Sequence, residues 1–108
     1  MKILLDEGVP DIIKKRLSRF LIFSVNEMGW RGVKNGALLD LMAGDFRIII
    51  TTDKNLPFQQ NFKKRQISEI ILPTNEIPAV IELIPEIEQA VATLSAGEFK
   101  ELKTTPQL

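Results

Sequence analysis

The chain has 108 residues, 44% of them hydrophobic, with 14 basic and 14 acidic residues and neither cysteine nor histidine. This size suits one domain with one core, so we expect residues 1–108 to form a single unit with a frayed tail over 104–108. The zero net charge excludes nucleic-acid binding driven by overall charge, and the missing thiols and imidazoles mean that any metal must be bound by oxygen.

Short apolar runs alternate with segments of helical periodicity along the chain. The expected elements, in chain order, are a strand (2–5), a helix (10–19), a strand (21–25), an ordered loop (28–34), a helix (35–42), a strand (47–51), a short helix (56–62), a basic loop (63–65), a strand (67–72), a helix (77–95) and an edge strand (98–103). Asn35 is expected to cap its helix. Pro85 falls inside the last helix, where we expect a kink or a break.

Strands that alternate with helices predict an α/β fold with a mostly parallel sheet and right-handed crossovers. Four to five strands are expected, with helices covering the sheet. No stretch approaches the ~20 apolar residues of a membrane span, and the apolar run at the start is too short for a signal peptide. We therefore expect a soluble, cytoplasmic protein with no membrane partner.

Two of the predicted strands end in an aspartate. Asp6 follows the first strand, and Asp53 follows the strand at 47–51. If these strands are parallel neighbours, both carboxylates lie in the crevice at the carboxyl end of the sheet, where ligands bind in open α/β folds. Such a pair of like charges is explained by a divalent cation, although aspartates after strands also cap the turns that follow.

Three motifs in order carry a resemblance to a known family. They are LLDE at residues 4–7, GWRG with KNG at 29–36, and TTDKNL with QQN at 51–61. Together they resemble the PIN-like DUF5615 family over residues 2–97, nearly the whole chain. The resemblance implies a PIN-like three-layer sandwich and a nuclease that uses Mg²⁺ or Mn²⁺ to cut RNA. Some proteins of this type are similar to the toxin components of toxin–antitoxin modules.

The resemblance, transferred residue by residue, implies that Asp6 and Asp53 are metal ligands, with Glu7 as a possible third. Many relatives carry a further acid where this chain reads Asn35-Gly36-Ala37, so Asn35 is a candidate to orient a water in place of that acid. In a site with a single metal ion, Asp6 and Asp53 would hold the ion, and Glu7 or Asn35 would orient the water that the metal activates. The departure at Asn35 also opens the alternative of an inactive site.

Basic and aromatic residues near the predicted crevice supply candidate substrate contacts. Lys54 follows Asp53, and either neutralises a phosphate or pairs with a carboxylate in place of a metal. Arg31 and Lys34 are candidates for phosphate contacts that a neutral protein otherwise lacks. Trp30 is either a lid over the core or a platform on which a base stacks.

Two functions from different classes remain open at this stage. The first is a metal-dependent endoribonuclease acting on single-stranded RNA, as the toxin of a pair whose antitoxin protein blocks the crevice. The second is a non-catalytic PIN-like interaction protein with a degenerate acidic site. Both allow a homodimer, for which the apolar final helix (77–95) is the expected seam.

Overall fold

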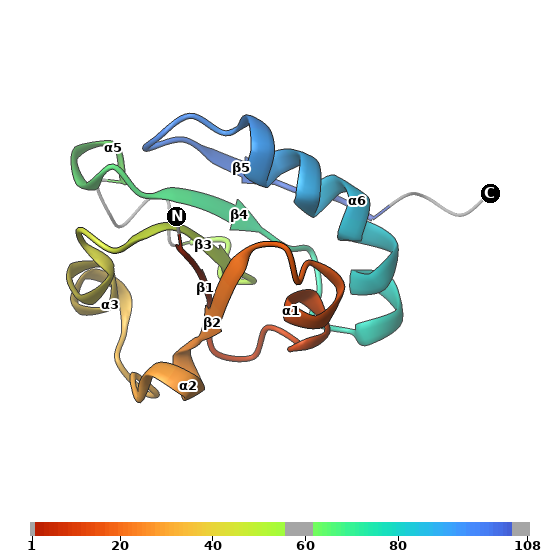
Figure 1. Ribbon diagram of the computed structural model, residues 1–108, viewed down its shortest axis with the longest axis horizontal. Coiled ribbons are helices and arrows are strands. Elements are labelled where there is room, and N and C mark those ends of the chain that lie inside the picture. The colour runs from red at the N-terminus through yellow and green to blue at the C-terminus, as the bar shows by residue number, and fades with distance from the viewer. Residues whose placement is uncertain (1, 56–61, 105–108) are drawn as a thin grey trace.

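The computed structural model describes residues 2–55 and 62–104 and shows an α/β fold (Figure 1). Its five strands form one sheet, in the order β2-β1-β3-β4-β5, and every neighbouring pair is parallel. Helices cover both faces of this sheet. The predicted three-layer sandwich with four to five strands is confirmed.

The strands are β1 (Lys2–Leu5), β2 (Leu21–Ser24), β3 (Phe46–Thr51), β4 (Ser68–Ile71) and β5 (Phe99–Glu101). The helices are α1 (Ile12–Arg16), α2 (Val25–Met28), α3 (Asn35–Met42), α5 (Phe62–Arg65) and α6 (Ile77–Thr93). Each predicted strand is present, with ends that differ by up to two residues from the prediction.

The helices differ more from the expectation than the strands do. Residues 63–65, expected to be a basic loop, belong to α5, and α2 occupies a segment for which no helix was expected. The first helix is shorter than predicted because Leu17 leaves the helical conformation, with φ −114° and ψ 46°. The short helix expected over 56–62 lies outside the described residues except for Phe62, which opens α5.

Of the kink or break expected at Pro85, the break is absent, because α6 runs as one helix from Ile77 to Thr93 with Pro85 inside it. Proline removes one backbone hydrogen bond and crowds the preceding turn. Leu83 and Ile87, on either side of it, are both buried, whereas Pro85 itself is exposed. Packing of both halves of the helix against the sheet therefore outweighs the local cost of the proline.

Alternating residues of the central strands supply two separate core clusters. Ile3 and Leu5 of β1 point to the face that α1 and α6 cover, whereas Leu4 points to the opposite face. That opposite face is covered by α2, α3 and α5, and Figure 1 shows these three helices on the left of the sheet and α1 and α6 on the right. The strands are apolar on both faces for this reason, as in other parallel sheets.

The connection through α6 differs in hand from its neighbours. The chain passes from β1 to β2 through α1, and from β4 to β5 through α6, on the same face but toward opposite edges of the sheet. Two parallel crossovers on one face that run in opposite directions have opposite hands. The β2–β3 connection, through α3 on the other face, shares the hand of the first. Since about 98% of such connections are right-handed, this sheet contains a rare left-handed one.

An aromatic cluster anchors the loop that follows α2. The rings of Phe46 and Trp30 lie 5.6 Å apart between centroids, and those of Phe46 and Phe23 lie 6.1 Å apart, both edge to face. The Lys2 ammonium lies 5.3 Å from the centroid of Phe23. Trp30 therefore acts as a partly buried lid on the core, and it holds the start of the loop that leads into α3.

Helix α2 is fixed by a capping box that the sequence contains as Ser24-Val25-Asn26-Glu27. The Ser24 Oγ accepts a hydrogen bond from the Glu27 backbone N–H, and the Glu27 carboxylate accepts one from the Ser24 N–H, both at 3.1 Å. Lys14 donates to the same carboxylate and, with the Ser24 contact, holds the pKa of Glu27 below its ordinary value. Gly29 ends the helix with a φ of +74°, in the left-handed region that glycine adopts readily.

We expect Ser24→Ala to lower the free energy of unfolding by about 1 kcal/mol, because the backbone N–H of Glu27, in the first turn of α2, loses the Ser24 hydroxyl as its acceptor. Urea unfolding monitored by circular dichroism measures the change. Ser18→Ala, at an exposed position in the turn after α1, is the matched control and should stay within about 0.5 kcal/mol of the unsubstituted protein. Equal losses in the two variants would contradict a role for the cap.

The valine and isoleucine side of α6 lies inside the protein. Val80, Leu83, Ile87, Ala90 and Val91 are buried against the sheet and α1. This apolar face is therefore not available as the seam of a dimer. None of the helices in the described part of the chain is long and apolar enough to cross a membrane.

Candidate functional site

Asp6 and Asp53 lie at the carboxyl ends of two adjacent parallel strands. In the sheet register Leu5 faces Ile50, and the Asp6 N–H donates to the Ile50 carbonyl oxygen at 2.9 Å. The chain leaves β1 toward β2 on one side, while β3 lies on the other side, so the strand order reverses between β1 and β3. Ligands of open α/β sheets bind at such a point of reversal.

Thr51, the last residue of β3, connects the two aspartates. Its hydroxyl donates to the Asp6 Oδ2 at 2.7 Å and accepts from the Asp53 N–H at 3.0 Å. The other oxygen of Asp6 accepts the Glu7 N–H at 2.8 Å, and Asp53 Oδ1 accepts the Asn55 N–H at 2.9 Å. Thr51 is completely buried, so this residue fixes the position of Asp6 and of the backbone at Asp53 from inside the core.

The two aspartates line a cavity of about 360 Å³. Its walls come from the ends of β1 and β3, from the loop before α3 and from α3 itself. The lining residues are Asp6, Glu7, Gly32, Val33, Lys34, Leu38, Leu39, Ile49, Asp53 and Asn55. The floor is apolar and the rim carries three carboxylates and one ammonium. An apolar surface with a few polar groups around it is typical of small-molecule sites.

Glu7 is held by the loop rather than directed freely into the cavity. Its Oε1 accepts the Gly32 N–H at 2.9 Å. Gly32 has a φ of +84°, which lets the backbone turn toward the carboxylate. Glu7 therefore closes the rim by joining the end of β1 to the loop that Trp30 anchors.

The remaining predicted site residues are spread around this cavity. Lys34 lines it, whereas Arg31 and Lys54 are exposed and lie outside its lining. The expected cap at Asn35 was wrong, because Asn35 is the first residue of α3 and Lys34 holds the capping position, so the helix begins one residue earlier than a cap at Asn35 implies. The Asn35 side chain lies outside the described part of the structure. Asp40, one turn further along α3, is exposed and pairs with Arg65.

Sequence reasoning missed Glu69, in the middle of β4. Its side chain is 0% exposed, and neither carboxylate oxygen has a hydrogen-bond partner among the described residues. Glu69 faces Ile49 in the register of β3 and β4, so it points to the same face of the sheet as that cavity residue. The signal was present in the sequence as a lone acid inside an otherwise apolar strand.

Burial raises the pKa of Glu69 to about 8, and the negative charges of Asp53 and then Asp6 add to the effect. A carboxyl with this pKa is protonated in most molecules at neutral pH. The electrostatic effect also shows that the three acids share one neighbourhood. Perturbed carboxyls that adjoin a cavity are candidates for functional groups.

The donor set determines which ligands fit. Among the described residues, every charged group that lines the cavity, apart from Lys34, is a carboxylate. Within residues 2–55 and 62–104, no group of three or more acidic side chains is placed to hold a metal ion. Two carboxylates with waters completing the shell suit Mg²⁺ or Mn²⁺ better than a fully enclosed cation such as structural Ca²⁺.

Comparisons with known protein families, characterised proteins and solved structures find no match. The resemblance of the sequence to the DUF5615 family therefore remains a prediction. The site stands on its own geometry: two aspartates joined by Thr51, a cavity with one lysine at its rim, and a buried acid behind it.

Proposed function

We propose that the protein is a metal-dependent ribonuclease of the PIN-like type, whose site is the cavity between Asp6 and Asp53. The observation that carries the proposal is the buried Glu69, which has no hydrogen-bond partner in the described part of the chain, near two further acids at the point where the strand order reverses. Three carboxyls in one neighbourhood are unfavourable unless a cation or a proton compensates them. A binding site for a cation explains the arrangement, and the DUF5615 resemblance supports the same two ligands.

Asp6 and Asp53 would hold one Mg²⁺ or Mn²⁺ ion. The ion would supply a lowered pKa for a bound water and charge stabilisation for a phosphate, which the absent histidine cannot provide. Thr51 holds the Asp6 carboxylate in place through its 2.7 Å hydrogen bond, so the position of that ligand does not depend on solvent. Hydrogen bonds of this kind, from a neighbouring group to a metal ligand, orient the ligand in metal sites generally.

The other residues of the rim would contact the substrate. Lys34 lines the cavity and is suited to a phosphate of the RNA backbone. Arg31 and Lys54 are exposed beside it and would contact phosphates further along a single strand. A toxin role would be opposed by an antitoxin protein that covers the cavity.

A second candidate function is a non-catalytic interaction protein that keeps the fold. It is favoured by the absence, within the described residues, of a group of three acids that could hold a metal. Asn35-Gly36-Ala37 in place of an acid at the start of α3 is consistent with it. On this reading the proton on Glu69 replaces the cation.

Calorimetric titration with Mn²⁺, combined with cleavage of single-stranded RNA on the same samples, separates the two functions. We expect Asp6→Asn and Asp53→Asn each to abolish both binding and cleavage, because each removes one of two direct ligands. Asp11→Asn, which removes an exposed acid before α1, is the control and should leave both unchanged. Binding without cleavage would favour the interaction protein, and no binding by the unsubstituted protein would exclude the metal site.

A further inference from the structure

Strand β5 leaves one edge of the sheet open. It pairs with β4 on one side, and within the described residues no strand lies on its other side. The backbone bonds to β4 use Glu98 and Leu102: the Glu98 carbonyl accepts from the Glu69 N–H, and the Leu102 N–H donates to the Ile71 carbonyl. Because inward and outward groups alternate along a strand, the N–H and C=O groups of Phe99 and Glu101 point outward.

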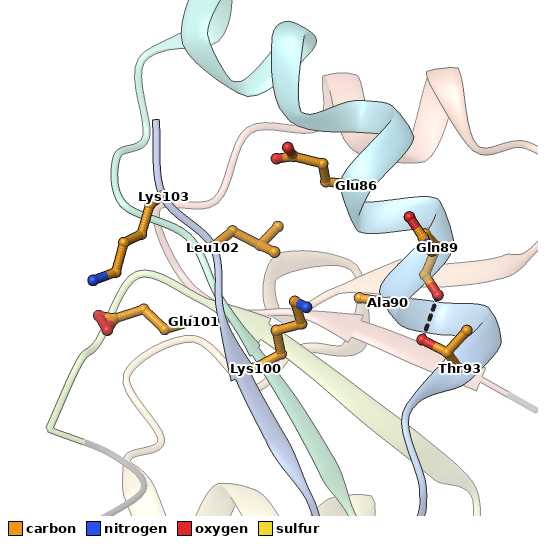
Figure 2. A pocket seen from close by; sticks show the side chains of 8 residues that line it. All are labelled: Glu86, Gln89, Ala90, Thr93, Lys100, Glu101, Leu102 and Lys103. Carbon is orange, nitrogen blue, oxygen red and sulfur yellow. Dashed lines mark hydrogen bonds between the residues drawn. The ribbon is translucent and has the colours of Figure 1, made fainter. Parts of the chain in front are cut away.

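A groove runs between this edge and α6. It has a volume of about 430 Å³ and is lined by Glu86, Gln89, Ala90, Thr93, Lys100, Glu101, Leu102 and Lys103. Figure 2 shows Lys100 and Leu102 on the side of β5 that faces α6, and Glu101 and Lys103 pointing the other way. A strand added to the edge of β5 would lie along this groove, as in other cases of strand addition.

We propose that the occupant of this edge is β5 of a second copy of the chain, paired antiparallel about a two-fold axis at Phe99. A two-fold axis that extends the sheet must be perpendicular to it, and residues that face each other then point to the same side of the sheet. Because successive residues alternate between sides, the numbers of two facing residues must sum to an even value. The register centred on Phe99 places Glu98 opposite Lys100 of the second copy, and Lys100 opposite its Glu98. It also brings together the two Phe99 rings, each 54% exposed in the single chain.

The neighbouring registers are less favourable. A centre at Lys100 would place the two lysines face to face, and a centre at Glu101 would do the same for two glutamates. A centre at Leu102 would pair Glu101 with Lys103, but Leu102 is already only 4% exposed beneath α6 and would bury little more. Charges on an edge strand normally prevent association. Here they select one register instead.

The opposite edge of the sheet lacks this property. Its strand β2 carries Leu21, 56% exposed, but Leu21–Ser24 contains no charged residue that could set a register. The proposal does not depend on the chemistry of the Asp6–Asp53 cavity, which lies elsewhere in the sheet.

Single-cysteine variants test the register, because the chain contains no cysteine of its own. In the proposed pairing the Cα atoms at position 99 of the two copies lie about 5.5 Å apart, within the range of a disulfide. The Cα atoms at position 101 lie about 14 Å apart, which is too far. We expect Phe99→Cys to form a disulfide-linked dimer under mild oxidation much faster than Glu101→Cys or, on the other edge, Leu21→Cys. Equal or faster linkage of either of the other two would overturn the proposal.

Charge reversal provides an independent test that keeps Phe99. We expect Glu98→Lys and Lys100→Glu each to weaken dimerisation about tenfold in sedimentation equilibrium. The pair of residues 98 and 100 occurs twice in the dimer, so each substitution creates two pairs of like charges across the interface. The double variant should restore the affinity of the original chain. Glu98 also accepts a hydrogen bond from the Ser95 N–H, but the double variant lacks that bond too, so restoration cannot come from it. A monomer at every accessible concentration, or no restoration, would overturn the proposal.

Discussion

Glu69→Gln is expected to flatten the pH dependence of stability between about pH 5 and pH 8. The folded protein raises the pKa of Glu69 to about 8, from an ordinary value of 4.5. Between these two values the folded state holds a proton that the unfolded state has lost. The free energy of unfolding of the original chain therefore falls as pH rises, by up to about 1.4 kcal/mol per pH unit.

Glutamine has nearly the same shape and cannot ionise, so the variant avoids this loss. We expect the stability of Glu69→Gln, relative to the original chain, to increase by about 3 kcal/mol from pH 5 to pH 8. Urea unfolding at intervals of one pH unit, with a chelator present, measures the difference. Glu101→Gln, at an exposed position on β5, is the control and should follow the original chain at every pH. Parallel curves for the original chain and Glu69→Gln would show that Glu69 is ionised in the folded protein.

The other large effect is expected at Phe46, the centre of the aromatic cluster beneath the loop. Phe46 is 2% exposed and contacts the rings of Trp30 and Phe23 edge to face. We expect Phe46→Ala to lower the free energy of unfolding by about 3–5 kcal/mol, because it opens a cavity and removes both ring contacts. Phe46→Leu fills part of that space and should lose clearly less.

Chemical denaturation with Trp30 fluorescence as the probe measures this loss, since Trp30 is the only tryptophan. Leu41→Ala is the control, because Leu41 is 46% exposed on α3 over the same face of the sheet. A loss at Phe46 no larger than that at Leu41 would contradict the central role of the cluster. Because Trp30 also anchors the loop that supplies Gly32 to Glu7, we expect the Phe46→Ala protein to lose order at the cavity rim first.

The strands were predictable because an apolar run of four to six residues bounded by polar ones has few alternatives. Asp6 and Asp53 could be assigned to strand ends for the same reason. The sequence does not state that β1 and β3 are neighbours; the register of the sheet shows it. Helix α2 was missed because its four residues are too few for a periodic pattern, although its capping box was readable.

One wrong expectation and one omission have a common origin in packing between distant segments. Pro85 predicts a break when only its own turn is considered, but burial on either side keeps α6 continuous. Glu69 was not singled out within its predicted strand, and its burial follows from the position of β4 between β3 and β5 with both faces covered. In both cases the neighbours that decide the outcome are far away in the sequence.

The unusual hand of the α6 connection determines what covers Glu69. With the hand of the other crossovers, the 17 residues of α6 would lie on the same face as α3 and Glu69. The chain instead places α6, the longest helix among the described residues, on the far side and leaves the Glu69 side to the eight residues of α3 and the four each of α2 and α5. A redesign that gave this connection the common hand would add α6 to the cover over the neighbourhood that Glu69 shares with Asp53 and Asp6.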